Sequence, residues 1–374
     1  MGGMYIHVPF CRQACRYCDF YFTVSLKYRD SYVASLLTEL TRRKDSPDAG
    51  EIDTIYLGGG TPSVLTEEQL EMIMGTIRKH YRVRKDAEIT IEANPDDLKE
   101  DYPGMLRRSG FNRLSIGVQS FQEKDLELMR RSHTAEQAVK CMELAHSKGF
   151  ENISMDLIYG VPGLTLGEWE ENVRITMKQP IGHISAYHLT YEPGTVFHHW
   201  KKKGRLKELP EQTSIEQYRL LREITAENGF EHYEISNFAK KGFRSKHNST
   251  YWSGVNYLGF GPSAHSYNGT ERRWNIASLK GYIEKVNGGG IYYESEQLTS
   301  TEKYHDYLIT SLRTVSGADT DHIESVFGNE ILNDLLGKVQ KFMGSNDLLM
   351  QEGILKMTPE GWLKSDMIIG ELML

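Results

Sequence analysis

Three of the four cysteines in the chain lie within eight positions, in the stretch CRQACRYCDF at residues 11–20. Their spacing is Cys11-x3-Cys15-x2-Cys18, and the fourth, Cys141, is distant in the sequence. In a reducing compartment, clustered cysteines more often bind metal or take part in chemistry than form disulfides. The spacing therefore indicates a metal centre held by one loop.

Two kinds of metal centre use such a loop. Structural zinc takes four ligands in a tetrahedron, so His7, His133 or Cys141 would have to complete the set. A cubane [4Fe-4S] cluster takes one ligand per iron, so three cysteines leave one iron open for a substrate or cofactor. We favour the [4Fe-4S] cluster and keep zinc as the alternative.

Polar residues also end several short apolar segments of the sequence. A run of three glycines begins the stretch GGGTP at residues 58–62, and Glu92, Gln119 and Asp156 lie at or near the ends of three later segments. Consecutive glycines let backbone groups approach a ligand closely, although a tight strand-to-helix turn explains them equally well. Each polar residue taken singly is more often structural, because a buried polar group needs a partner. Together they predict a binding site.

The elements that must position these residues are read from the hydrophobic pattern. Six strand-like segments alternate with helix-length stretches, at 4–8, 54–57, 88–92, 113–118, 153–158 and 184–189. The pattern predicts helices at 66–81, which opens with a capping box, and at 135–148. Such alternation predicts a parallel α/β sheet, either doubly wound or a partial (β/α) barrel. Both architectures bind ligands at the carboxyl ends of their strands.

The pattern changes after about residue 200. We predict a helix over 211–228, an aromatic and glycine-rich stretch over 233–267, and a linker at Gly288 to Gly290. Helices at 300–315 and 319–343, a hairpin at 348–357 and a final helix after Thr358 follow. We expect three parts: a core domain at 1–235, a connecting segment at 236–290, and a small helical, winged-helix-like domain at 291–374.

Composition narrows the class of protein. The 374 residues are 39% hydrophobic and 25% charged, and 44 basic against 51 acidic residues give a net charge of −7. This balance argues weakly against a nucleic-acid partner. The sequence has no apolar run of membrane-spanning length and no evident signal peptide, so we expect a cytoplasmic protein without a stable membrane span.

The cysteine spacing after YIHVPF resembles that of the radical S-adenosyl-L-methionine superfamily. The resemblance implies a partial (β/α)6 barrel and a [4Fe-4S] cluster bound by Cys11, Cys15 and Cys18. It further implies that S-adenosyl-L-methionine chelates the open iron, and that the reduced cluster cleaves this cofactor to a 5′-deoxyadenosyl radical.

Further motifs resemble the oxygen-independent coproporphyrinogen III oxidase group within that superfamily. These are YIHVPFC, GGGTP, EANP, SIGVQSF, DLIYG and the late TPEGW. The resemblance implies a set of residues that contact S-adenosyl-L-methionine: Tyr5, Tyr17, Gly59, Gly60, Thr61, Glu92, Gln119, Arg131 and Asp156. Taken alone, Arg131 would pass for a solvated helix charge.

The same group contains heme chaperones, and the sequence departs from the oxidases toward them. The oxidase pattern continues CxxxCxxCxC, whereas Phe20 stands at the last position here, and only ten residues precede Cys11. The stretch HNSTYW at 247–252 matches the motif HNxxYW, which the resemblance links to heme. Histidine is a competent axial ligand of heme iron. Read alone, the hexapeptide would be ordinary packing.

We therefore expect a chaperone that binds heme, with His247 contacting the iron, and transfers it to an unidentified acceptor protein. The aromatic and glycine-rich stretch from Tyr257 to Tyr267, which includes His265, is expected to form the opposite wall of the heme site. The alternatives are the oxidase reaction, radical decarboxylation of coproporphyrinogen propionates, and radical chemistry on another substrate.

Overall fold

The computed structural model describes residues 2–45 and 50–374. Its centre is a run of six parallel strands in sequential order. They are β1 (Gly2–Val8), β2 (Ile52–Gly59), β3 (Val83–Ala93), β4 (Arg113–Gln119), β5 (Asn152–Tyr159) and β6 (His183–His188). All six predicted strands are confirmed. The sheet has free edges and is not closed, so it forms an open, partial barrel.

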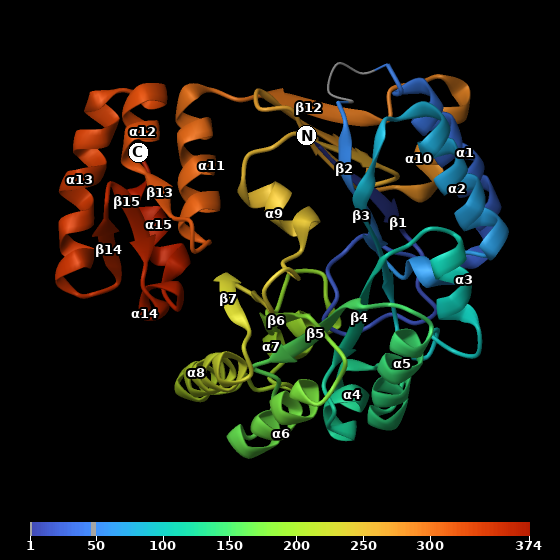
Figure 1. Ribbon diagram of the computed structural model, residues 1–374, viewed down its shortest axis with the longest axis horizontal. Coiled ribbons are helices and arrows are strands. Elements are labelled where there is room, and N and C mark those ends of the chain that lie inside the picture. The colour runs from blue at the N-terminus through green and yellow to red at the C-terminus, as the bar shows by residue number, and fades with distance from the viewer. Residues whose placement is uncertain (1, 46–49) are drawn as a thin grey trace.

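Helices connect successive strands, and most of them lie along the outer side of the sheet (Figure 1). They are η1 (Leu26–Tyr28), α1 (Arg29–Arg42), η2 (Pro62–Val64), α2 (Glu67–His80), α3 (Tyr102–Arg108), α4 (Glu123–Met129), α5 (Ala135–Ser147), α6 (Leu166–Met177), α7 (Val196–Lys202) and α8 (Glu211–Glu227). The capping box of α2 is formed, because the Thr66 hydroxyl accepts from Gln69 N and the Gln69 side chain accepts from Thr66 N. The three helices predicted in this region, at 66–81, 135–148 and 211–228, agree with α2, α5 and α8 within one residue at each end.

Successive side chains of β1 point alternately to the hydrophobic core and to the inner face of the sheet. Met4, Ile6 and Val8 are completely buried in the hydrophobic core. Tyr5 and His7 lie between them and therefore point to the opposite side of the sheet. This inner face of β1 leads directly into the cysteine loop.

Residues 231–297, which include the expected connecting segment at 236–290, extend the same sheet at both edges. The elements are β7 (Glu231–Glu234), β8 (Asn237–Ala239), α9 (Lys246–Trp252), β9 (Tyr257–Phe260), β10 (His265–Tyr267), β11 (Glu271–Asn275), α10 (Leu279–Gly288) and β12 (Tyr293–Gln297). Strand β9 pairs with β1 and brings β10, β11 and β12 to one edge, while β8 pairs with β6 at the other. The glycines predicted as a linker instead end α10, since Gly289 has the left-handed φ of 75° typical of a helix C-cap.

The C-terminal residues form a second hydrophobic core beside a three-stranded sheet, seen at the left of Figure 1. Its elements are α11 (Ser300–Leu312), β13 (Ala318–Asp319), α12 (Thr320–Phe327), α13 (Asn329–Gly344), β14 (Leu348–Gln351), β15 (Ile354–Met357), α14 (Pro359–Trp362) and α15 (Ser365–Leu372). The predicted hairpin is confirmed, and its turn residues Glu352 and Gly353 both have positive φ. The predicted single helix at 319–343 is wrong, because Gly328 at a φ of 96° separates α12 from α13. The three-part domain division stays a prediction.

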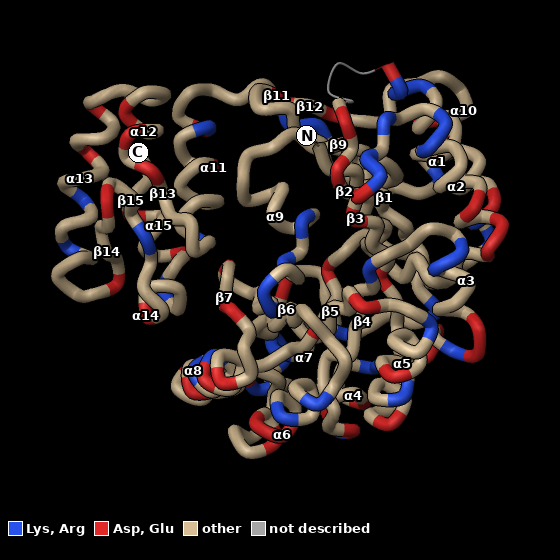
Figure 2. The backbone as a smooth tube through the Cα atoms, in the orientation of Figure 1, with Lys and Arg blue, Asp and Glu red and all other residues tan. Residues whose placement is uncertain are grey.

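Charged residues of both signs are mixed along the outer helices, as Figure 2 shows for α6 and α8. In the described residues, no helix is long and apolar enough to cross a membrane.

Candidate cluster site and adjoining cavity

The three clustered cysteines lie on the loop that follows β1, and all three are partly exposed. The backbone fixes the start of this loop, because Cys11 N donates to Thr23 O at 3.0 Å. Its middle is held against the end of α4, where Arg16 N donates to Met129 O at 3.1 Å. The fourth cysteine, Cys141, is buried on α5 and donates to Ala138 O.

Two other site residues touch the thiols. The Thr61 hydroxyl donates to Cys11 Sγ at 3.6 Å, and the Arg131 guanidinium donates from Nη1 to Cys15 Sγ at 3.4 Å. Burial raises the pKa of the Cys11 thiol to about 11 and that of Cys18 to about 12. Metal binding at this loop would therefore have to release protons. Across residues 2–45 and 50–374, no three His, Cys, Asp or Glu side chains converge as ligands of a single ion.

The glycine run packs directly on β1 and the cysteine loop. Gly59 has a φ of 105°, and a Cβ there would lie 2.4 Å from His7 Nδ1. A Cβ at Gly60 would lie 2.6 Å from Phe10 O. Gly60 N donates to Val8 O at 2.9 Å, and Thr61 N donates to Phe10 O at 2.6 Å. The glycines are therefore required here for close packing against the loop that bears the cysteines.

Glu92 faces the same space from the end of β3. Its carboxylate accepts from the Tyr56 hydroxyl at 2.8 Å and from Gly59 N at 3.1 Å. Burial raises the pKa of Glu92 to about 7, even though both hydrogen bonds act to lower it. Asp156 on β5 behaves similarly: it accepts from the Ser115 hydroxyl, and burial raises its pKa to about 6. Two carboxyl groups with raised pKa thus lie on the inner face.

Gln119 and Arg131 complete this side of the site. A register shift between Gly117 and Gln119 marks a bulge, and Gln119 has the left-handed φ of 70°, which few non-glycine residues adopt. Arg131 Nη2 donates to Asn94 Oδ1 and to Gly117 O, both at 2.6 Å. Arg131 Nε is buried and has no hydrogen-bond partner among the described residues. Such a buried donor is available to an acceptor atom of a bound ligand or of an ordered water.

The two tyrosines predicted to contact the cofactor occupy different places. The Tyr5 hydroxyl on β1 is hydrogen-bonded with His7 Nδ1 at 3.1 Å. Tyr17 lies within the cysteine loop and packs against the main core, and its burial raises its pKa. The predicted residues from Tyr5 to Asp156 are therefore distributed over the loop and the inner face of β1 to β5.

His247, which is predicted to contact heme iron, is buried and hydrogen-bonded at both ring nitrogens in this structure. Only 1% of the residue is exposed, and both ring nitrogens have partners. Nδ1 is hydrogen-bonded with the Thr54 hydroxyl at 2.8 Å, and Nε2 with the Tyr251 hydroxyl at 3.0 Å. Burial lowers the pKa of His247 to about 3, so the ring is neutral at physiological pH. Ligation of iron would require Tyr251 to move away from Nε2.

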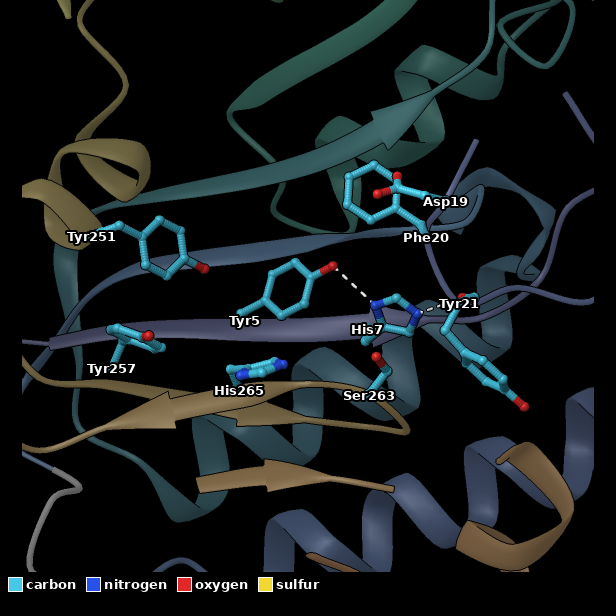
Figure 3. Close-up of a pocket in the computed structure, with 9 residues that line it drawn as sticks. All are labelled: Tyr5, His7, Asp19, Phe20, Tyr21, Tyr251, Tyr257, Ser263 and His265. Carbon is cyan, nitrogen blue, oxygen red and sulfur yellow. Dashed lines mark hydrogen bonds between the residues drawn. The ribbon is translucent and has the colours of Figure 1, made fainter. Parts of the chain in front are cut away.

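A cavity of about 340 Å³ opens beside the cysteine loop. It is lined by Tyr5, His7, Asp19, Phe20, Tyr21, Tyr251, Tyr257, Ser263 and His265 (Figure 3). Phe20, which marks the departure from the oxidase pattern, is 64% exposed. Tyr257, Ser263 and His265 belong to the stretch expected to form one wall of the heme site, whereas Asp19 and Tyr21 were not predicted to line it. Both were detectable in principle, because they lie within three positions of Cys18.

The fold and the cysteine loop define the class of protein. The sequence model of the radical SAM superfamily matches residues 5–175. The structure superposes with a TM-score of 0.86 on the solved structure of coproporphyrinogen III oxidase (HemN) from Escherichia coli, which is described as a radical SAM enzyme. The match covers 99% of this chain and 89% of HemN at 24% identity, which establishes a shared fold. A radical SAM domain implies a [4Fe-4S] cluster and S-adenosyl-L-methionine.

Curated relatives narrow the class further. The chain is 36% identical to the heme chaperone HemW of Bacillus subtilis, over 99% of this chain and 98% of HemW. It is 35% identical to HemW of Lactococcus lactis, over 87% and 85% of the two chains. It is 32% identical to HemW of Escherichia coli, over 84% and 83%. The chain belongs to the HemW family of the radical SAM superfamily.

Proposed function

We propose that the chain is a heme chaperone that binds heme in the cavity beside the cysteine loop and transfers it to an acceptor protein. The observation that carries this proposal is the lining of the cavity. Four tyrosines, one phenylalanine and two histidines surround it, so it offers flat apolar surfaces and imidazole nitrogen in one place. Its volume lies within the range of about 300–1,000 Å³ usual for small-molecule sites.

The proposal places a [4Fe-4S] cluster next to this cavity. Cys11, Cys15 and Cys18 would hold three of its irons, and the fourth would be open to S-adenosyl-L-methionine. The donor set fits such a group, because a guanidinium and a hydroxyl already donate to two of the thiols. When bound, the cluster would supply an electron for reductive cleavage of the cofactor.

The chain's own residues would bind and orient S-adenosyl-L-methionine. The free Nε of Arg131 is a donor for an anionic group of the cofactor, and Glu92 and Asp156 are acceptors for its ammonium or hydroxyl groups. Gly59 and Gly60 let the glycine turn pack against β1 and the cysteine loop, which keeps Glu92 and the thiols close together. Tyr5 lines the cavity and also lies beside Tyr56, which donates to Glu92, so the proposed cofactor and heme sites adjoin one another.

The motif HNxxYW contributes to the cavity through Tyr251. His247 is hydrogen-bonded with the Tyr251 hydroxyl, and Tyr251 lines the cavity. His247 therefore positions an aromatic wall from behind. We further propose that the protein acts in the cytoplasm and meets its acceptor there.

The test compares chaperone and oxidase activity in one preparation. The cluster is reconstituted anaerobically, and heme is titrated while the Soret band is recorded. The loaded protein is then mixed with a heme-free globin, and coproporphyrinogen is assayed for decarboxylation in parallel. We expect a saturable Soret change and transfer of heme to the globin. Decarboxylation with enzymatic turnover, or no saturable heme binding, would refute the proposal.

A further inference from the structure

Three histidines lie in or next to the proposed heme cavity, and they differ in whether their nitrogens are available. His7 has partners on both ring nitrogens, because Nδ1 is hydrogen-bonded with the Tyr5 hydroxyl and Nε2 with Tyr21 O at 2.8 Å (Figure 3). His247 is likewise engaged at both nitrogens. Within residues 2–45 and 50–374, neither ring nitrogen of His265 has a hydrogen-bond partner, and its side chain is exposed to the cavity.

His265 is also held in a defined orientation. It lies on β10, where it pairs with Trp274 of the antiparallel strand β11. The two rings are stacked, with their centroids 6.2 Å apart and an angle of 26° between their planes. Packing on a large aromatic ring restricts the imidazole without using either nitrogen. Such a side chain presents a lone pair at a fixed position, which is what a metal ligand requires.

The state of ionisation is consistent with this role. Burial lowers the pKa of His265 below its ordinary value, and the nearby Arg272 acts in the same direction. The ring is therefore neutral at physiological pH, and neutral imidazole is the form that binds metal. The tyrosines of the cavity are less suited, because burial raises the pKa values of Tyr251 and Tyr257 and disfavours the phenolate.

We propose that His265 is the axial ligand of heme iron in this cavity. The proposal rests on the proposed function and deepens it by naming the iron ligand. The porphyrin would lie among the aromatic side chains, with Phe20 on the cysteine-loop side and Tyr257 on the β9 side. The HNxxYW motif then shapes the cavity without binding the iron.

The experiment is a ferric heme titration of the full-length, cluster-reconstituted protein, read by Soret absorbance and electron paramagnetic resonance. His265→Ala is expected to weaken heme binding by about tenfold or more and to change the iron spectrum, because the axial bond is lost. Added imidazole should restore the wild-type spectrum by entering the space left by the side chain. His265→Met should retain bound heme with a shifted spectrum and a higher reduction potential, as expected for thioether ligation.

The matched control is His146→Ala, on the exposed surface of α5, which should leave heme binding and spectrum unchanged. His247→Ala should keep the axial spectrum of the wild type even where affinity falls. If His265→Ala and His265→Met both show the wild-type spectrum and affinity, His265 is not the ligand although heme binding stands. If the wild type itself does not bind heme, the proposed function fails instead.

Discussion

Replacement of Gly60 by alanine tests whether the glycine run supports the cysteine loop. An added Cβ would lie 2.6 Å from Phe10 O, 2.8 Å from Val8 O and 2.9 Å from Phe10 N. All three are backbone atoms, which cannot rotate away as a side chain does. Gly60 lacks the left-handed φ of Gly59, so the cost of the substitution is one of space.

The magnitude follows from the packing. Inserting a methyl group into a filled site costs about 1–3 kcal/mol. We expect the upper half of that range, because relief requires β1 and the glycine turn to separate. Separation would lengthen the hydrogen bonds from Gly60 N to Val8 O and from Thr61 N to Phe10 O. It would also displace Cys11, which follows Phe10 directly.

The assay measures two quantities in Gly60→Ala: the free energy of unfolding of the cluster-free protein in urea, and the iron bound per chain after reconstitution. Both should fall. The control is Gly75→Ala on α2, where a Cβ meets nothing within 4 Å. This change should stabilise the protein by about 0.5–1 kcal/mol, because alanine favours helix over glycine. Wild-type stability and iron content in Gly60→Ala would refute the reasoning.

Three further predictions concern the site. The pKa of Glu92 in the folded protein is about 7, above its usual value of 4.5. The folded protein therefore binds this proton more tightly than the unfolded chain, and the resulting stabilisation is complete below pH 4.5 and is lost as the pH rises through 7. Urea denaturation of cofactor-free Glu92→Gln should lack this loss, and identical pH profiles of the two proteins would contradict it. Arg131→Lys should retain less S-adenosyl-L-methionine by equilibrium dialysis, since it loses the planar fork that contacts Asn94 and Gly117, whereas exposed Arg130→Lys should match the wild type. His247→Ala should lower the free energy of unfolding by about 1–3 kcal/mol, because it leaves the buried Thr54 hydroxyl without this partner; an unchanged urea midpoint would show that the contact contributes nothing.

Much of the fold was predictable because its signals are local. The buried strands are short apolar runs ended by glycine or polar residues, and the helices α2 and α5 open with capping boxes. Local sequence signals gave wrong predictions where the same pattern is compatible with two different local structures. Gly328 interrupts an otherwise helical sequence, and glycine in such a pattern is compatible with either a continuous helix or a break. The three glycines that include Gly289 have the composition of a linker. In the structure Gly289 instead caps α10, and the chain then continues into β12, which pairs with β11 in the sheet.

The sequence alone determined which kind of site to expect, because three cysteines at this short spacing can offer three thiolates to a metal centre from one loop. Only the tertiary structure decided which histidine is available to a ligand. Thr54, whose hydroxyl is hydrogen-bonded with His247, lies 193 positions away in the sequence. His265 lies on β10, which reaches the site because β10 pairs with β9 and β9 pairs with β1. The availability of a nitrogen depends on such distant partners. Hydrogen bonds occupy both ring nitrogens of His247, whereas those of His265 have no partner among the residues that the structure describes.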